Sequence, residues 1–130
     1  MKNIKYTLIS LAIVYACFNF YAYSEIDNLV MSHNAIVTDI NALRSQIGTY
    51  VETNKNLEYR AQVDILFSKD EIDSMKKEIE ANKKRINECS DELEALKVLR
   101  NDRLAQIQNA NRIYSKWLLV RPNTNIMILI

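Results

Sequence analysis

Apolar residues recur every three or four positions over most of the chain, a period that predicts long amphipathic helices. In the first half the repeat is a heptad whose d positions are all apolar. The a positions are Ile26, His33, Ile40, Ile47, Asn54 and Ala61, and the d positions are Leu29, Ile36, Leu43, Tyr50 and Leu57. Valines at three e positions (Val30, Val37 and Val51) make the stripe wider than a two-stranded seam, as in a bundle or a higher oligomer. The pattern predicts a first coiled-coil helix over residues 25–66.

A second heptad follows, four residues out of step with the first. Its a positions are Ile72, Ile79, Ile86, Leu93, Arg100, Ile107 and Tyr114, and its d positions are Met75, Asn82, Cys89, Leu96, Arg103, Ala110 and Trp117. This repeat predicts a second coiled-coil helix over residues 67–121. Pro122 ends it, because the residue before a proline is disfavoured in the helical conformation.

Where the two registers meet, the sequence allows two architectures. Ser68 and Glu71 have the spacing of a capping box, which allows a helix to begin at residue 69 and the chain to fold back as an antiparallel hairpin. Alternatively, the offset is a stutter in one continuous or kinked rod of about 95 residues, about 140 Å long. Because Ile65-Leu66-Phe67 is a poor loop, we favour the rod.

The N-terminal segment has the length and charge pattern of a membrane anchor. Residues 6–24 carry no charge and lie between two bases (Lys2 and Lys5) and two acids (Glu25 and Asp27). As a helix they would be about 28 Å long, close to the hydrocarbon thickness of a bilayer. The flanking charges predict a cytoplasmic N-terminus. We expect residues 1–24 to be an uncleaved signal anchor in the inner membrane, with the C-terminus in the periplasm.

Two other fates of this segment stay open. Ala22 and Ser24 are small residues at the −3 and −1 positions of a signal-peptide site, and cleavage after Ser24 would make the protein periplasmic or secreted. A lipoprotein signal ending at Cys17 is the third hypothesis. All three export residues 25–130, in a bacterium to the periplasm or cell surface. Ser24 also resembles a helix N-cap, because acids follow in the next turn, so we expect a helix to start there.

Composition and charge narrow the class of protein. The 130 residues include one Gly and one Pro, which excludes barrels, sandwiches, Gly-rich phosphate loops and nucleophile elbows and leaves an all-α fold. The net charge is +1 without a basic field, so no nucleic-acid partner is expected. His33 is the only histidine and neither cysteine lies in a metal-binding motif. We predict no metal, no cofactor, no small-molecule substrate and no enzymatic activity.

Four seam residues carry specific predictions. Polar residues His33, Asn54 and Asn82 are expected to fix register and oligomer state, with a pH-sensitive seam as the alternative for His33. Cys89 occupies a d position, so in a parallel homodimer of the rod its thiol can form an intermolecular disulfide in an oxidising compartment. Its alternative is a small buried apolar residue, and in a hairpin it would face the first helix. We expect a homo-oligomer formed through the heptads.

The chain closes on an apolar tail, residues 122–130. Its last five residues are Ile126, Met127, Ile128, Leu129 and Ile130. This run either packs back on Trp117 and Leu118 or docks into a partner protein, as an added strand or an apolar plug. We expect a protein partner at the C-terminus.

A basic start, one membrane-spanning segment, an exported coiled coil with a seam cysteine and a terminal docking segment resemble the inner-membrane spanins of tailed phages. The resemblance implies a dimeric rod that meets an outer-membrane lipoprotein and drives fusion of the two membranes in host-cell lysis. It would make Cys89 the dimer-linking cysteine and Ile126–Ile130 the docking end. The wide apolar stripe of the first heptad departs from a simple two-stranded rod.

The segment Leu119-Val120-Arg121-Pro122-Asn123, followed by an apolar end, is similar to the terminal segment of divisome proteins of the septum-formation-initiator family. That similarity implies a cell-division scaffold, although the Gly usual after the proline is missing. We predict a non-enzymatic single-pass envelope protein that oligomerises through heptads and docks a partner, with a phage-type spanin as one hypothesis. The alternatives are a secreted or periplasmic helical binding module, of secretion-system or chaperone-like type, and a cell-division scaffold.

Overall fold

The computed structural model describes residues 2–63, 67–119 and 122. They form two long helices, α1 (Lys2–Val63) and α2 (Lys69–Tyr114), and the described residues contain no strand. The prediction of an all-helical chain with a long apolar helix at its N-terminus is confirmed. The scarcity of helix breakers explains the helix lengths, since Gly48 is tolerated within α1 and Pro122 lies beyond α2.

The expected helix start at Ser24 is wrong, because α1 runs without a break from Lys2 to Val63. Nothing in residues 6–24 breaks a helix, so the amides after Ser24 find their partners in the preceding turn and no cap is needed there. The N-terminal part of α1 is long and apolar enough to cross a membrane, with a mean hydropathy of 1.4 over its best window, and 6% of that window is buried.

The continuous rod that we favoured from the sequence is also wrong. Helix α1 ends at Val63, and α2 begins at Lys69 behind a capping box. The Ser68 amide donates to Glu71 Oε2 (2.8 Å), and the Glu71 amide donates to Ser68 Oγ (3.3 Å). These bonds satisfy backbone amides that have no partner at the start of a helix. A new helix therefore begins here although no Gly or Pro lies nearby.

Helix α2 ends earlier than expected, at Tyr114 rather than at Arg121. A turn over residues 115–117 follows, in which the amides of Trp117 and Leu118 both donate to the Tyr114 carbonyl (3.0 and 3.2 Å). Proline is therefore not the cause of the stop. Contacts with α1, described below, hold the chain at this point.

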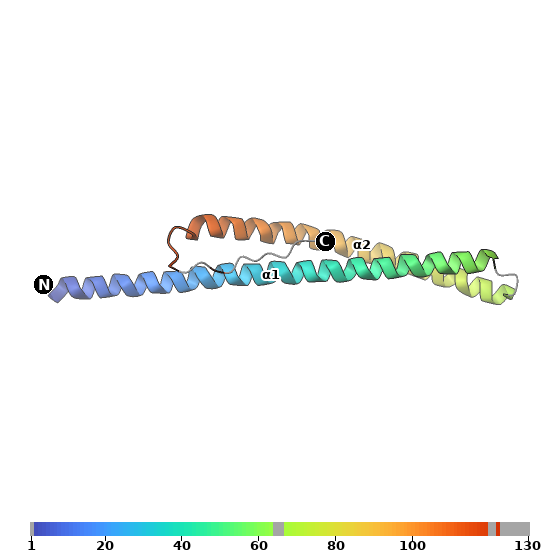
Figure 1. Cartoon of the computed structure of the whole chain (residues 1–130), viewed down its shortest axis with the longest axis horizontal. Coiled ribbons are helices and arrows are strands. Elements are labelled where there is room, and N and C mark those ends of the chain that lie inside the picture. Colours follow the sequence, from blue (N-terminus) through green and yellow to red (C-terminus); the bar gives the residue numbers. More distant parts are fainter. Residues whose placement is uncertain (1, 64–66, 120–121, 123–130) are drawn as a thin grey trace. The chain divides into compact units, whose positions relative to one another are not determined.

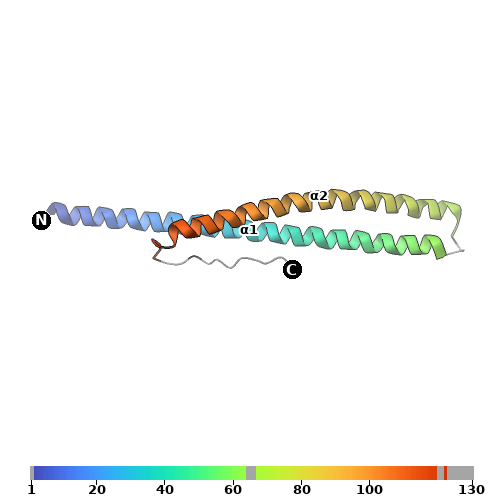
Figure 2. The ribbon, with the colours of Figure 1, turned by 90° about the horizontal axis from the view of Figure 1, so that it is seen from above.

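The chain divides into two compact units, which we call the terminal unit (Met1–Val37 with Leu99–Ile128) and the central unit (chiefly Thr38–Val98). In each unit a segment of α1 lies beside a segment of α2 (Figures 1 and 2). Within each unit, residues later in α1 contact residues earlier in α2, so the pairing is antiparallel. In the central unit the two segments form a helical hairpin.

Burial follows the stripe read from the sequence. In the terminal unit the core consists of Ile26, Val30, Ile107 and Ala110, with Leu29, Tyr114 and Leu118 packed against it. In the central unit it consists of Leu57, Met75 and Ile79, with Ala61 and Phe67 alongside. Apart from Trp117, whose exposed fraction is 59%, the a and d positions of the second heptad are buried or half-buried. Each stripe therefore packs against the other helix of the same chain.

Candidate functional site

In the terminal unit, the last residues of α2 and the turn behind them contact the apolar part of α1. We call residues 6–24 the apolar segment and residues 113–119 the α2 end. The apolar segment is otherwise exposed, and large side chains such as Leu8 and Phe20 keep 61% and 76% of their surface accessible. The α2 end contacts the second half of this segment through Tyr15, Phe18 and Asn19.

Two polar side chains of the apolar segment hold the backbone of the α2 end. The Tyr15 hydroxyl donates to the Trp117 carbonyl at 2.6 Å, and the Leu119 amide donates to Asn19 Oδ1 at 2.6 Å. The other end of the Asn19 side chain donates to the Tyr15 carbonyl of its own helix (2.9 Å), which fixes its orientation. We call Tyr15 and Asn19 the clasp. It satisfies backbone groups that have no partner where a helix ends.

Apolar surfaces surround the clasp. The rings of Phe18 and Tyr114 meet edge to face, with centroids 5.6 Å apart and an interplanar angle of 67°. An open groove of about 550 Å³ runs between the helices. It is lined by Leu11, Val14, Tyr15 and Phe18 of α1 and by Ile113, Tyr114 and Trp117 of the α2 end. A groove of this composition suits an apolar chain or surface rather than a charged ligand.

One titratable group in this region has a shifted pKa. Hydrogen bonding with the Glu25 side chain, followed by burial and the nearby negative charge, raises the pKa of Tyr114 above its usual range. The Oε2 atom of Glu25 is buried without a hydrogen-bond partner. Glu25 and Tyr114 thus form a polar contact just beyond the apolar segment.

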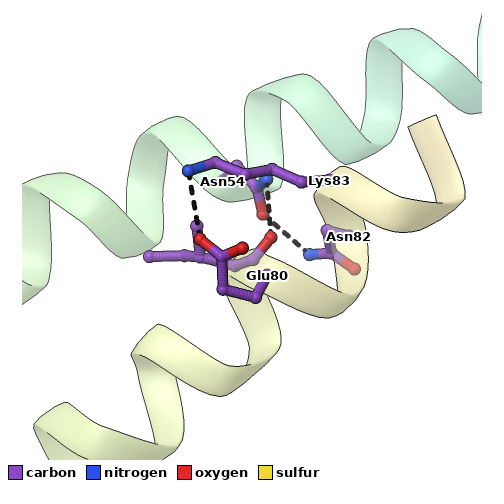
Figure 3. Close-up of polar contacts among 5 residues, drawn as sticks. Asn54, Glu80, Asn82 and Lys83 are labelled. Atoms are coloured by element: carbon purple, nitrogen blue, oxygen red, sulfur yellow. Dashed lines mark hydrogen bonds and ion pairs between the residues drawn. The ribbon is translucent and has the colours of Figure 1, made fainter. Parts of the chain in front are cut away.

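In the central unit, the two predicted seam asparagines lie against each other (Figure 3). The Asn82 side-chain amide donates to Asn54 Oδ1 (2.9 Å), and the Asn54 amide donates to the Ile79 carbonyl (3.2 Å). Both side chains are buried. Beside them, Lys83 and Glu80 form an exposed ion pair at 3.3 Å. The sequence predicted the seam position of both asparagines, and the structure brings them together within one chain.

The other predicted seam residues lie apart from this pair. His33, in the terminal unit, is 2% exposed, and its Nδ1 lies 3.4 Å from Asn34 Oδ1. Cys89, in the central unit, is half-buried with a free thiol 4.0 Å from Gln46 Oε1 of α1. Its seam therefore faces α1 of the same chain, as expected for a hairpin. The tail residues Ile126–Ile130 lie outside the described residues.

The clasp was not predicted from the sequence. The first heptad, extended backwards from Ile26, places Asn19 at an a position and both Tyr15 and Ala22 at d positions. Ala22 is fully buried, in keeping with this extension. A strongly polar Asn inside an uncharged segment, four residues after a Tyr, is the signal that could have revealed the site.

The arrangement offers an apolar groove beside two hydrogen-bonding side chains, Tyr15 and Asn19. Among residues 2–63, 67–119 and 122, no three His, Cys, Asp or Glu side chains lie close enough to hold a metal ion. No protein-family model, curated protein or solved structure matches the chain.

Proposed function

We propose that the chain is a single-pass protein of the bacterial envelope, anchored by residues 6–24 and serving as a non-enzymatic scaffold that binds a partner protein outside the inner membrane. The N-terminus is cytoplasmic in this proposal, because Lys2 and Lys5 precede the apolar segment and Glu25 and Asp27 follow it. Residues from Glu25 onwards are exported.

One observation carries the choice of an anchor over a cleaved signal peptide. Helix α1 continues through Ser24, and Tyr15, Phe18 and Asn19 on its N-terminal side contact the α2 end. Cleavage after Ser24 would remove all three side chains, together with the fully buried Ala22. The α2 end would then lose its hydrogen-bond partners and expose the ring of Tyr114. The folded terminal unit therefore favours a retained segment.

The antiparallel pairing also argues against a parallel rod dimer. A parallel rod dimer would place Cys89 opposite its copy, whereas within the hairpin Cys89 lies near Gln46. The a and d positions pack between α1 and α2 of one chain, so the scaffold needs no second copy to cover its stripe. For this reason we propose a binding scaffold rather than a fusion rod of spanin type. The partner contact through residues 122–130 stays a prediction.

Expression in a Gram-negative host tests the anchor. We expect full-length mass in the membrane fraction, resistance to alkaline extraction, and protease sensitivity of the exported part in spheroplasts. A soluble periplasmic protein whose mass begins at Glu25 would contradict the proposal and support a released binding module.

A matched variant sharpens this experiment. Ser24→Leu removes the small residue that a signal peptidase needs at −1. The variant should have the mass of the wild type plus the substitution alone. Processing of the wild type that disappears in Ser24→Leu would show that residues 1–24 are a signal peptide.

A further inference from the structure

The clasp lies far from the exported end of the apolar segment. Tyr15 lies nine residues before Ser24, which corresponds to about 14 Å along a helix. The hydrocarbon core of a bilayer is about 30 Å thick, so Tyr15 lies near its middle if residues 6–24 span it. Because the α2 end is bonded to Tyr15 and Asn19, it either enters the outer leaflet with them or separates from α1.

Resting on the proposed anchor, we propose that the α2 end is a second membrane-inserted element, which lies in the outer leaflet beside α1 and is held there by the clasp of Tyr15 and Asn19. Its partner is the lipid of that leaflet. The anchor is then a helix accompanied by a short wedge rather than a lone span.

The clasp has the chemistry that such an insertion requires. In lipid no water is available for the backbone groups of a helix end, so every exposed amide and carbonyl must be paired within the protein. Tyr15 pairs the Trp117 carbonyl and Asn19 pairs the Leu119 amide, both at 2.6 Å. Polar side chains buried between membrane helices commonly act in this way. Such a role also explains an Asn in an otherwise uncharged apolar segment.

The outward face of the α2 end is suited to lipid. Ile113, Trp117 and Leu119 are 50%, 59% and 73% exposed, although they are large and apolar. Ile113 and Trp117 line the groove together with Leu11 and Val14 of the anchor, which are themselves 60% and 66% exposed. Arg112 is exposed on the same stretch and lies more than one helical turn nearer the outer surface than Trp117, so its long side chain can extend toward lipid phosphates.

Trp117 is the only tryptophan of the chain, so its fluorescence reports on the α2 end alone. The experiment uses the full chain in vesicles of phosphatidylcholine and phosphatidylglycerol, with nitroxide groups on the acyl chains as lipid quenchers and iodide as the aqueous quencher. We expect emission shifted to shorter wavelength, strong quenching by the nitroxide lipids and little quenching by iodide.

Two results would overturn the insertion. Strong iodide quenching with no effect of the nitroxide lipids would place Trp117 in water. Protection from both quenchers would place it under protein, as in contact with a second copy. Alkaline extraction of the same vesicles separates the hypotheses: retained protein with a water-exposed Trp117 contradicts the wedge alone, whereas extracted protein contradicts the anchor itself.

The double variant Tyr15→Phe/Asn19→Leu tests the clasp. It removes both hydrogen bonds and makes the anchor more apolar, so membrane retention is kept. We expect a loss of nitroxide quenching and a gain of iodide quenching. The control is Ser10→Ala, whose hydroxyl bonds only to the Tyr6 carbonyl of its own helix and whose loss should leave Trp117 unchanged. Unchanged Trp117 quenching in the double variant would show that the clasp does not hold the α2 end.

Discussion

The buried asparagine pair determines which residues of α1 and α2 face each other in the central unit. Asn54 and Asn82 are 7% and 4% exposed, and each makes a hydrogen bond that a one-residue slip would break. Leu57, Met75 and Ile79 pack next to them, but apolar side chains can repack in more than one register. A polar pair of this kind contributes selectivity for one register more than stability.

We expect Asn82→Ala to lower the free energy of unfolding by about 1–3 kcal/mol, because Asn54 Oδ1 would stay buried without a donor. Denaturant unfolding followed by circular dichroism measures the change. Replacing both asparagines by leucine should cost much less, since no buried polar group is then left unpaired. The exposed Asn87→Ala is the matched control and should change stability by no more than about 0.5 kcal/mol. Equal effects of Asn82→Ala and Asn87→Ala would contradict the pairing.

The contact of Tyr114 with Glu25 predicts a pH dependence. The pKa of Tyr114 is raised in the folded chain, so the unfolded phenol ionises first, near pH 10. The stability that this contact contributes is therefore fully present below about pH 10 and is lost as the pH rises through the folded pKa. Ultraviolet titration, with Tyr114→Phe subtracted, should show that Tyr114 ionises above pH 10.

Glu25→Gln removes the negative charge beside Tyr114, so the pKa of Tyr114 should fall toward its ordinary value. The neutral amide still offers an oxygen to the hydroxyl, which makes the variant a test of charge rather than of shape. Titration of Tyr114 at its ordinary pH in both wild type and variant would show that the two side chains are not in contact.

At the scale of the elements, the sequence predicted which face of each helix is buried. It did not predict where α2 ends. The a and d periodicity identified the buried positions from Ile26 to Ala110, because burial of an apolar stripe is a repeating, local signal. The end of α2 at Tyr114 has no such signal. It depends on Tyr15 and Asn19, about a hundred residues away in sequence, and a long-range contact of this kind leaves no trace in local propensity.

The choice between a hairpin and a rod depended on a single box of four residues. The Ser68 and Glu71 side chains and amides bond to each other, whereas the apolar residues before them suggested a continuous helix. Phe67 resolves this conflict, because it packs on the core of the central unit and lies under Arg60, whose guanidinium carbon is 5.1 Å from the ring centroid. Phe67, in the connection, is thus half-buried against this core without being part of a helix.

Ser68→Ala should lower the free energy of unfolding by about 1 kcal/mol, because the first turn of α2 loses its cap. The exposed Ser74→Ala, within α2, is the control and should be neutral or slightly stabilising, since alanine has the higher helix propensity. Both changes are measured by denaturant unfolding of the full chain. If both variants unfold like the wild type, α2 does not begin at this box.

At the scale of the whole molecule, each of the two units contains an antiparallel pair of helices, and we propose that the apolar segment is retained as an anchor. The first feature is what the sequence left undecided, because an amphipathic stripe does not reveal whether its partner lies in the same chain or in another copy. Cys89 illustrates this point, because a cysteine at a d position fits either a disulfide-linked dimer or a contact with Gln46 of the same chain. Both the asparagine pair and the clasp depend on the pairing within one chain.

Chemical cross-linking of Gln46→Cys to the native Cys89 tests this pairing most directly. In a Cys17→Ser background, a short bifunctional thiol reagent should join the two cysteines within one chain and give a cross-linked monomer by mass and on non-reducing gels. Gly48→Cys is the matched control, because a side chain there meets nothing within 4 Å and should react with the reagent without forming a link. Cross-linked dimers through Cys89, with no internal link in Gln46→Cys, would show that the helices pair between chains and would contradict the account.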